Sequence, residues 1–189
     1  MTNHKVQNLK FTTGNSYDSI TEIVSPTNSD LDVLTLKTVR LNEIQPECRI
    51  NTENSEFVLD ILAGTISVFV LTESNQYQFH SIGHRAHVFD GKPTMLYLPP
   101  GCQATLVCES LNFEGALFSA PAESKSEPVV IFPDEAQAKS VGQDNWQRSV
   151  VTSVGDNVNA SRLLVGETLN PPGNWSSSPP HKHDVDSDV

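Results

Sequence analysis

The segment FVLDILAGTISVFVLT, residues 57–72, decides the fold class of this 189-residue chain. It is rich in β-branched and aromatic residues, and Ala63-Gly64 divides it into two short apolar runs. β-Branched and aromatic side chains are enriched in strands, and glycine accepts the positive φ that a tight turn requires. The segment therefore predicts two strands joined by a hairpin at Ala63-Gly64.

Strand-like segments continue on both sides of this one. Residues 31–41, LDVLTLKTVRL, alternate mostly between apolar and polar types. Residues 86–110, AHVFDGKPTMLYLPPGCQATLVCES, predict a strand, a turn at Asp90-Gly91, a second strand, a break at residues 99–101 and a third strand. Short strands with turns at this spacing predict an all-β sandwich or barrel.

The C-terminal third of the chain has a different pattern. Residues 133–141, PDEAQAKSV, form the only stretch with a helical pattern, and residues 147–155 and 160–173 again predict strands. We therefore divide the chain into two β units. Residues 1–130 make one complete unit, and residues 131–189 hold a connector and the opening strands of a second unit that is too short to close a barrel.

The charge balance limits the possible partners. The chain has 23 acidic and 12 basic residues, a formal net charge of −11, and no cluster of Lys and Arg. Such a surface repels a phosphate backbone, so we expect no nucleic-acid partner. Residues 1–11 lack the apolar run of a signal peptide, and no stretch approaches a membrane span. Cys48, Cys102 and Cys108 have neither metal-type nor redox-type spacing, which favours reduced thiols in a cytoplasmic protein.

The first β unit lacks the metal motifs of a cupin-type barrel, which are H-x-H with a Glu before a hairpin glycine, and a His three residues after P-x-G. Before Gly64 stand Glu53 and Glu56 but no histidine, and Ala104 stands three residues after Gly101. A methyl group has no lone pair, and carboxylates alone suit a borderline metal poorly. We expect a cupin-like barrel without a metal.

Three further histidines, His80, His84 and His87, lie close together in sequence. Gly83 and the β-branched surroundings argue against a helix, and on a strand His87 would not share the face of the other two. We expect histidines in loops and at strand edges, with solvent or backbone partners, and an ion pair of Arg85 with Asp90 across the turn.

The C-terminal stretch NPPGNWSSSPPHKHD, residues 170–184, holds His181 and His183 one residue apart. On an extended strand both imidazoles point to the same face, which allows one segment to supply two metal ligands. Asn174 and Ser177 offer donors suited to a hydroxylated acid, and Trp175 offers an apolar wall with one N–H donor. The alternative is that these three residues only build the turn.

Residues 162–184, RLLVGETLNPPGNWSSSPPHKHD, resemble the signature of the 5-deoxy-glucuronate isomerases of myo-inositol catabolism, the IolB branch of the KduI/IolB family. Residues 83–101 resemble the N-terminal half of that family, with the pattern G-x-R-x-x-V-F-x-G-x-P followed by a strand and P-x-G. The resemblance implies a bicupin fold of two β-barrels, with the metal in the C-terminal one. It also implies metal-assisted aldose–ketose isomerisation of 5-deoxy-glucuronate to 5-dehydro-2-deoxy-gluconate through an enediolate.

The resemblance further implies a divalent metal, zinc or manganese, with His181 and His183 as two ligands. The remaining ligands, a Glu and a third His, are expected beyond Val189, and with them most of the second barrel. Asp188 stands five residues after His183, where the general cupin pattern has its Glu, but we do not expect it to be a ligand. Family members are expected to be homo-oligomers that act on a small sugar acid.

Two alternatives remain open at this point. One is a 4-deoxy-5-keto-uronate isomerase of pectin breakdown, the sister branch of the same family. The other is a non-catalytic module for sugar-acid binding or assembly, since the metal site is incomplete within these 189 residues.

Overall fold

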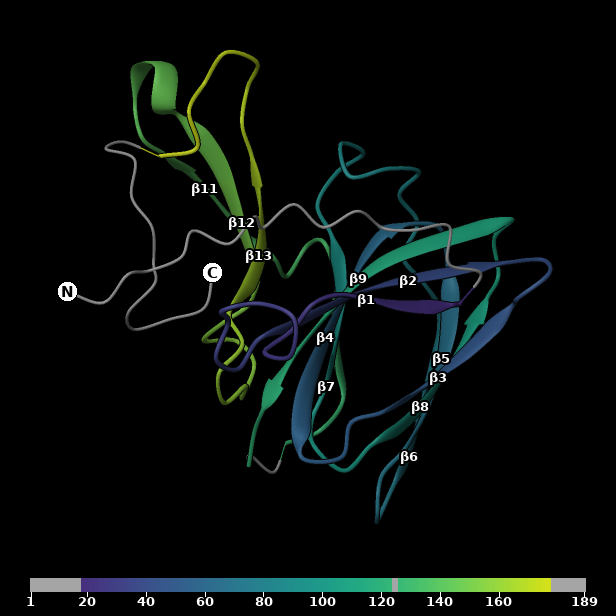
Figure 1. Cartoon of the computed structure of the whole chain (residues 1–189). Coiled ribbons are helices and arrows are strands. Elements are labelled where there is room, and N and C mark those ends of the chain that lie inside the picture. The colour runs from purple at the N-terminus through teal and green to yellow at the C-terminus, as the bar shows by residue number, and fades with distance from the viewer. Residues whose placement is uncertain (1–17, 124–125, 178–189) are drawn as a thin grey trace.

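The computed structural model describes residues 18–123 and 126–177, and within these ranges the chain is almost entirely β (Figure 1). The described strands, in chain order, are β1 (Ile20–Val24), β2 (Thr35–Asn42), β3 (Glu47–Asn51), β4 (Ser55–Ala63), β5 (Ile66–Leu71), β6 (Gln76–Ile82), β7 (Thr94–Leu98), β8 (Gln103–Cys108), β9 (Asn112–Pro121), β10 (Val129–Ile131), β11 (Gln137–Val141), β12 (Arg148–Val154) and β13 (Val165–Leu169). A short 3-10 helix, η1, covers Asp144–Trp146. No helix in the described ranges has the length and apolar character needed to cross a membrane. The all-β prediction is confirmed.

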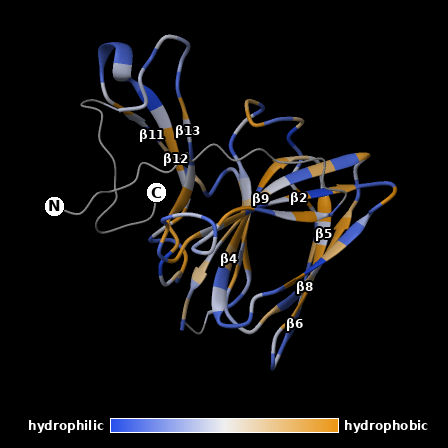
Figure 2. Cartoon of the chain, viewed as in Figure 1, coloured by the Kyte–Doolittle hydropathy of each residue, from blue (hydrophilic) through white to orange (hydrophobic). Residues whose placement is uncertain are grey.

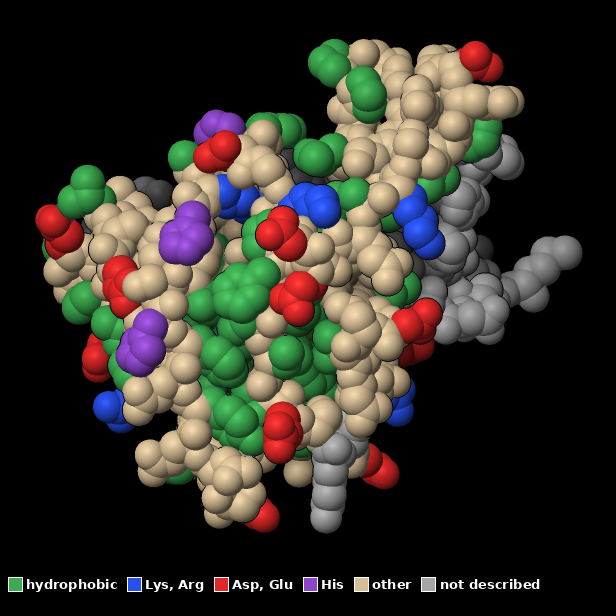
Figure 3. Space-filling model, turned by 180° about the vertical axis from the view of Figure 1, so that it is seen from behind, with side chains coloured by type: hydrophobic (Ala, Val, Ile, Leu, Met, Phe, Trp, Pro, Cys, Tyr) green, Lys and Arg blue, Asp and Glu red, His purple; other side chains and the backbone are tan. Residues whose placement is uncertain are grey.

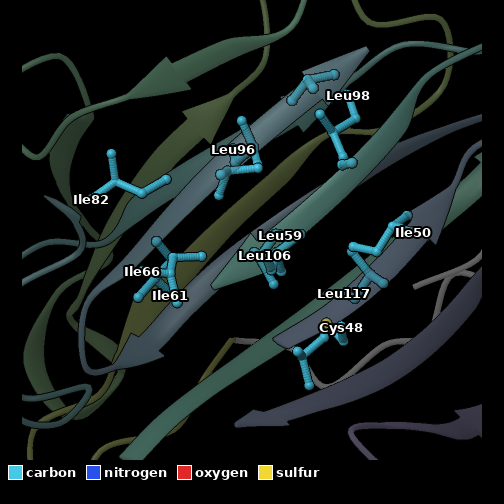
Figure 4. Packing of buried hydrophobic residues seen from close by; sticks show 14 of the residues in the cluster. Cys48, Ile50, Leu59, Ile61, Ile66, Ile82, Leu96, Leu98, Leu106 and Leu117 are labelled. Carbon is cyan, nitrogen blue, oxygen red and sulfur yellow. The ribbon is translucent and has the colours of Figure 1, made fainter. Parts of the chain in front are cut away.

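Two antiparallel sheets face each other and enclose the main core (Figure 1). Their strand orders are β1-β2-β9-β4-β7-β10 and β3-β8-β5-β6. Alternate side chains of each strand point inward and form one apolar cluster between the sheets (Figure 4). The buried members of this main core are Val39, Leu41, Cys48, Ile50, Leu59, Ile61, Ile66, Val68, Val70, Ile82, Leu96, Leu98, Cys102, Ala104, Leu106, Phe113, Leu117 and Val130. In the described part of the chain the two sheets stay separate, so this unit is a cupin-like barrel that is not closed by hydrogen bonds.

Gly64, the centre of the predicted hairpin, joins strands of different sheets. β4 pairs with β7 and β9, whereas β5 pairs with β6 and β8, so the hairpin prediction is wrong. Gly64 does have the expected positive φ, 90°. A Cβ there would lie 2.4 Å from the carbonyl oxygen of Asn112, so only glycine fits this crossing. Placing the two apolar strands in opposite sheets lets their side chains pack against each other across the core.

The helix predicted over residues 133–141 is also wrong. The segment begins with a turn and continues as β11, which pairs with β12 from Gln137 opposite Thr152 to Val141 opposite Arg148. Helix propensity is a weak preference in a stretch this short, and pairing with a neighbouring strand satisfies the backbone groups instead.

The third sheet, with the order β11-β12-β13, projects from the outside of the barrel and meets it at one end (Figure 1). At the end nearest the barrel, Val154 and Val165 join a second apolar cluster with Val58 and Tyr97. The other end of this sheet is largely hydrophilic (Figure 2). The division of the chain at residue 130 stays a prediction, and β10, a strand of the barrel, spans that position.

Candidate functional site

The segment predicted to bind substrate folds back against the connection between β11 and β12. The amide Nδ2 of Asn174 donates a hydrogen bond of 2.8 Å to the carbonyl oxygen of Gln147. The backbone N–H of Trp175 donates one of 2.8 Å to the carbonyl oxygen of Asn145. The residue Trp175 is 64% exposed, and Ser177 is partly buried. All three residues therefore follow the end of β13 that is remote from the barrel.

His181, His183 and Asp188 lie outside the described residues. Among the residues that the structure describes, no three His, Cys, Asp or Glu side chains are grouped so that they could hold a metal ion. The metal ligands thus stay a prediction, as do the substrate-binding roles of Asn174, Trp175 and Ser177.

Apolar side chains fill the interior of the first barrel. Ala104, which stands where the cupin pattern has a histidine, is 1% exposed and belongs to the main core. Gly101 precedes it in a turn, where its N–H donates a 2.8 Å hydrogen bond to the carbonyl oxygen of the exposed Glu53. These residues therefore serve the packing of the barrel.

A groove of about 1410 Å³ opens at one end of the barrel. Its lining includes three carboxylates, Glu73, Glu123 and Glu127, and one guanidinium, Arg162. Because these charges sum to a negative value, the groove is a poor place for a substrate that is itself an acid.

The three described histidines lie apart on the surface (Figure 3). His80 lies on β6, an edge strand, with its Nδ1 3.4 Å from the hydroxyl of Ser67 and its Nε2 3.3 Å from Oε1 of Gln78. His84 and His87 lie in the loop after β6. The predicted loop and strand-edge positions are confirmed, although the partners of His80 are side chains.

Glu56 is a buried carboxylate of β4 that fastens the third sheet to the barrel. Its Oε1 accepts hydrogen bonds from the backbone N–H groups of Arg162 at 2.7 Å and Leu163 at 2.8 Å. Its Oε2 accepts one from the N–H of Ser161 at 2.7 Å and one from the hydroxyl of Tyr97 at 3.0 Å. Four donors offset the cost of removing this carboxylate from water and fix the chain just before β13.

Arg85 makes a second connection between the barrel and the third sheet. Two N–H groups of its guanidinium donate to the two carboxylate oxygens of Glu167 on β13. Its Nη2 also lies 3.3 Å from Oδ1 of Asp60, and its Nε donates a 2.9 Å hydrogen bond to the carbonyl oxygen of Ile61. The ion pair expected between Arg85 and Asp90 is therefore wrong, and Asp90 accepts a backbone N–H within its own loop instead.

The buried cluster of Asp60, Arg85 and Glu167 has two carboxylates for one guanidinium. The pKa of Asp60 is raised to about 7, first by burial and then by the negative charge of Glu167, against the lowering effect of Arg85. Since Arg85 binds both oxygens of Glu167, Asp60 is the carboxyl group that takes the proton. With that proton the cluster is electrically neutral.

Our sequence reasoning missed both connections, although a signal was present. Glu56 and Asp60 are single acidic residues within the otherwise apolar strand β4. A charged group inside such a strand must be paired when it is buried, so each one indicates a partner elsewhere. The partners could not be found in the same way, because the backbone N–H partners of Glu56 lie 105 to 107 residues along the chain and Arg85, the partner of Asp60, lies 25 residues along it.

A profile of the KduI/IolB family matches residues 7–189. The match covers nearly the whole chain, including both stretches that resemble this family. The chain belongs to the KduI/IolB family. The buried connections through Glu56 and Arg85 are therefore features of a KduI/IolB protein, in which they join a cupin-like barrel to the strands that follow it.

Several curated 5-deoxy-glucuronate isomerases are similar to this KduI/IolB chain. The one from Halalkalibacterium halodurans is 29% identical over 164 residues, which are 86% of this chain and 59% of the relative. The one from Geobacillus kaustophilus is 32% identical over 139 residues, which are 74% of this chain and 49% of the relative. The one from Bacillus subtilis strain 168 is 29% identical over 165 residues, which are 87% of this chain and 59% of the relative. The chain thus spans about half to three fifths of the length of these relatives.

The fold of this KduI/IolB chain is also similar to solved structures. An IolB-like protein from Salmonella typhimurium LT2 superposes with a TM-score of 0.80 at 27% identity, covering 93% of this chain and 65% of that one. A protein described as glyoxylate-induced, from Pseudomonas aeruginosa, superposes with a TM-score of 0.55 at 12% identity, and shows a likeness of fold alone.

Proposed function

We propose that the chain acts in an isomerase that converts 5-deoxy-glucuronate to 5-dehydro-2-deoxy-gluconate in myo-inositol catabolism. The observation that carries the proposal is the family match over residues 7–189, together with the relatives named 5-deoxy-glucuronate isomerase. The chain spans 59% of the relative from Halalkalibacterium halodurans. We therefore propose, by similarity, that the activity named for that relative also applies to this chain.

The polar stretch after β13 suits a hydroxylated sugar acid. One amide N–H of Asn174 is held by the carbonyl oxygen of Gln147, which fixes the amide and leaves its Oδ1 and second N–H for a ligand. Trp175, largely exposed, can cover the apolar face of a sugar ring. Ser177 adds a hydroxyl. Together these groups would bind and orient the hydroxyl groups of the substrate.

His181 and His183 would hold a divalent metal, zinc or manganese. Imidazole nitrogens suit both ions, and the H-x-H spacing directs both rings to one face of an extended segment. Two imidazoles are an incomplete donor set, so a Glu and a third His are still required. When bound, the metal would supply Lewis-acid polarisation of the substrate carbonyl.

The chemistry is an internal proton transfer. A base removes the proton from the carbon next to the aldehyde, and negative charge develops on the two neighbouring oxygens of the resulting enediolate. The former aldehyde carbon then receives a proton, and the hydroxyl proton of the neighbouring carbon passes to the former aldehyde oxygen, so that the aldehyde becomes an alcohol and the alcohol a ketone. Amide and hydroxyl donors such as those of Asn174 and Ser177 would stabilise this charge when they are aimed at it.

Turnover of 5-deoxy-glucuronate by the purified protein tests the proposal. We expect His181→Ala and His183→Ala to lower both bound metal and kcat by more than the roughly 10–100-fold that loss of an outer-shell partner causes. His80→Ala, which removes an exposed imidazole of β6, is the control and should leave activity unchanged. Faster conversion of 4-deoxy-5-keto-uronate would favour the sister branch, and metal-independent binding without turnover would favour the non-catalytic module.

We also propose a cytoplasmic location and a homo-oligomeric state. Cys48, Cys102 and Cys108 are free thiols, as is usual in a reducing compartment. Burial raises the pKa of the Cys48 thiol to about 12, so this group is protected from thiolate chemistry. Fractionation of cells and the mass of the native protein in solution are the corresponding tests.

A further inference from the structure

None of the predicted substrate-binding residues carries a positive charge that could bind the carboxylate of a sugar acid. Asn174, Trp175 and Ser177 are neutral, while the chain as a whole has a formal net charge of −11. An anionic sugar approaching such a surface is repelled unless a local cation outweighs the overall field. A site for such a sugar in this segment therefore requires a basic side chain close by.

A basic residue, Arg148, lies close in the fold to the segment that holds Asn174, Trp175 and Ser177. Arg148 is the first residue of β12 and directly follows Gln147, whose carbonyl oxygen receives the amide of Asn174 at 2.8 Å. The next residue of β12, Ser149, lies opposite Leu169, the last residue of β13. Arg148 thus stands beside the point where the candidate segment leaves the sheet.

The side chain of Arg148 belongs to the face of the third sheet that is turned away from the barrel. Val151 is 2% exposed and lies opposite Glu167, the partner of Arg85, so these two residues mark the face toward the barrel. Arg148 is an odd number of residues from Val151 and therefore lies on the opposite face.

This opposite face is positively charged. Lys139 lies opposite Val150, which places it diagonally next to Arg148, at a Cα separation of about 7–8 Å. The paired residues that share the face are Gln137, Lys139, Val141, Arg148, Val150, Thr152, Gly166 and Thr168. Two of them are basic and none is acidic, although acidic residues outnumber basic ones nearly two to one in the chain. The remaining side chains are mostly small or polar, so the face is suited to a hydrated ligand rather than to a dry core.

The guanidinium of Arg148 has donors to spare. Its Nη1 lies 3.5 Å from the carbonyl oxygen of Trp146, a long contact, and within the described ranges no carboxylate forms an ion pair with it. Arg85, by contrast, donates hydrogen bonds to Glu167, to Asp60 and to a backbone carbonyl. A planar guanidinium fork matches the two oxygens of a carboxylate.

We propose that Arg148 binds the carboxylate of the sugar-acid substrate, with Lys139 adding to the positive potential of the same face. The proposal rests on the proposed function for the identity of the substrate. The preference for a carboxylate can nevertheless be measured without turnover.

The test is binding of D-glucuronate and of D-glucose, which differ in a carboxylate. The only two tryptophans of the chain, Trp146 and Trp175, lie at this end of the third sheet, so their fluorescence reports binding there. We expect the protein to prefer the acid, and Arg148→Met to weaken binding of glucuronate about 10- to 100-fold while glucose is unaffected. Arg148→Lys should keep part of the preference, and added salt should reduce it.

Arg40→Met is the matched control, because it removes one positive charge from an exposed ion pair on β2 of the barrel. It should leave binding of both sugars unchanged. Equal affinity for the two sugars in the unaltered protein, or an undiminished acid preference in Arg148→Met, would overturn the proposal.

Turnover separates this proposal from the proposed function. With 5-deoxy-glucuronate as substrate, Arg148→Met should raise KM by the same factor by which it weakens glucuronate binding, with a smaller change in kcat. If the unaltered protein prefers glucuronate through Arg148 but does not isomerise 5-deoxy-glucuronate, the proposed reaction fails and the carboxylate site stands.

Discussion

The barrel and the third sheet are stabilised in different ways. In the described part of the barrel, eighteen buried residues form one apolar cluster between the two facing sheets. The third sheet contributes only a few residues to a smaller cluster, and it is fastened to the barrel by the buried charged residues Glu56 and Arg85. Apolar packing is non-directional, whereas hydrogen-bonded charges require defined partners at defined places. The barrel thus supplies stability, and the two polar connections fix where the third sheet, with the candidate site at its far end, sits on it.

The largest effect should come from a cavity in the barrel. Leu96→Ala removes a fully buried side chain from the main core, and we expect a loss of about 2–5 kcal/mol in the free energy of unfolding, measured by denaturant titration. Leu111→Ala, at a residue that is 72% exposed, is the control and should change it by less than about 0.5 kcal/mol. Similar losses in the two variants would contradict the contrast between a packed core and its surface.

A somewhat smaller effect is expected at the first polar connection. Glu56→Ala leaves three backbone N–H groups without their acceptor and removes one hydrogen-bond partner of the Tyr97 hydroxyl, and we expect a loss on the order of 3 kcal/mol, since part of the freed groups can rehydrate. The tryptophan fluorescence of the third sheet should change at a lower denaturant concentration than the far-ultraviolet circular dichroism of the barrel. A single coincident transition would show that the third sheet does not depend on this carboxylate.

The second connection should make stability depend on pH. The pKa of Asp60 is raised to about 7 from an ordinary value of 3.8, so its protonated form stabilises the folded state at low pH, and this contribution is lost as the pH rises through about 7. We expect the difference in unfolding free energy between the native protein and Asp60→Asn to change by on the order of 2 kcal/mol from about pH 5 to pH 8, to the disadvantage of the native protein at the higher pH. Parallel pH profiles of the two proteins would contradict a protonated Asp60.

The smallest effect is expected for an ion pair on the surface of the barrel. Arg40 and Glu114 form a pair of 3.4 Å in which both side chains are more than half exposed. Arg40→Met should change the free energy of unfolding by less than about 1 kcal/mol, because solvent and salt screen such a pair. If Arg40→Met lowered the free energy of unfolding as much as Glu56→Ala does, exposed charges would stabilise this fold as strongly as buried ones, contrary to our expectation.

Sequence patterns predicted the strands but not how they are joined. The apolar runs on both sides of Gly64 are strands, and the glycine has the expected positive φ, yet the two strands belong to different sheets. Alternation and turn residues describe a strand and its ends, whereas its neighbours depend on contacts far along the chain. For the same reason the segment 133–141, expected to be a helix, is a turn followed by β11, which pairs with β12.

The sequence by itself determined the all-β class, the membership of the KduI/IolB family and the candidate stretch from Asn174 to His183. Each of these depends on residues that are close together in the chain. Only the tertiary structure decided that Asp60, Arg85 and Glu167 form one buried cluster, and that Asn174 bonds to Gln147, the residue before Arg148. The physical reason is that the partner of a buried charge is set by burial and by the register of distant strands. An acidic residue within an apolar strand can be recognised from the sequence, but the residue that pairs with it is known only from the folded structure.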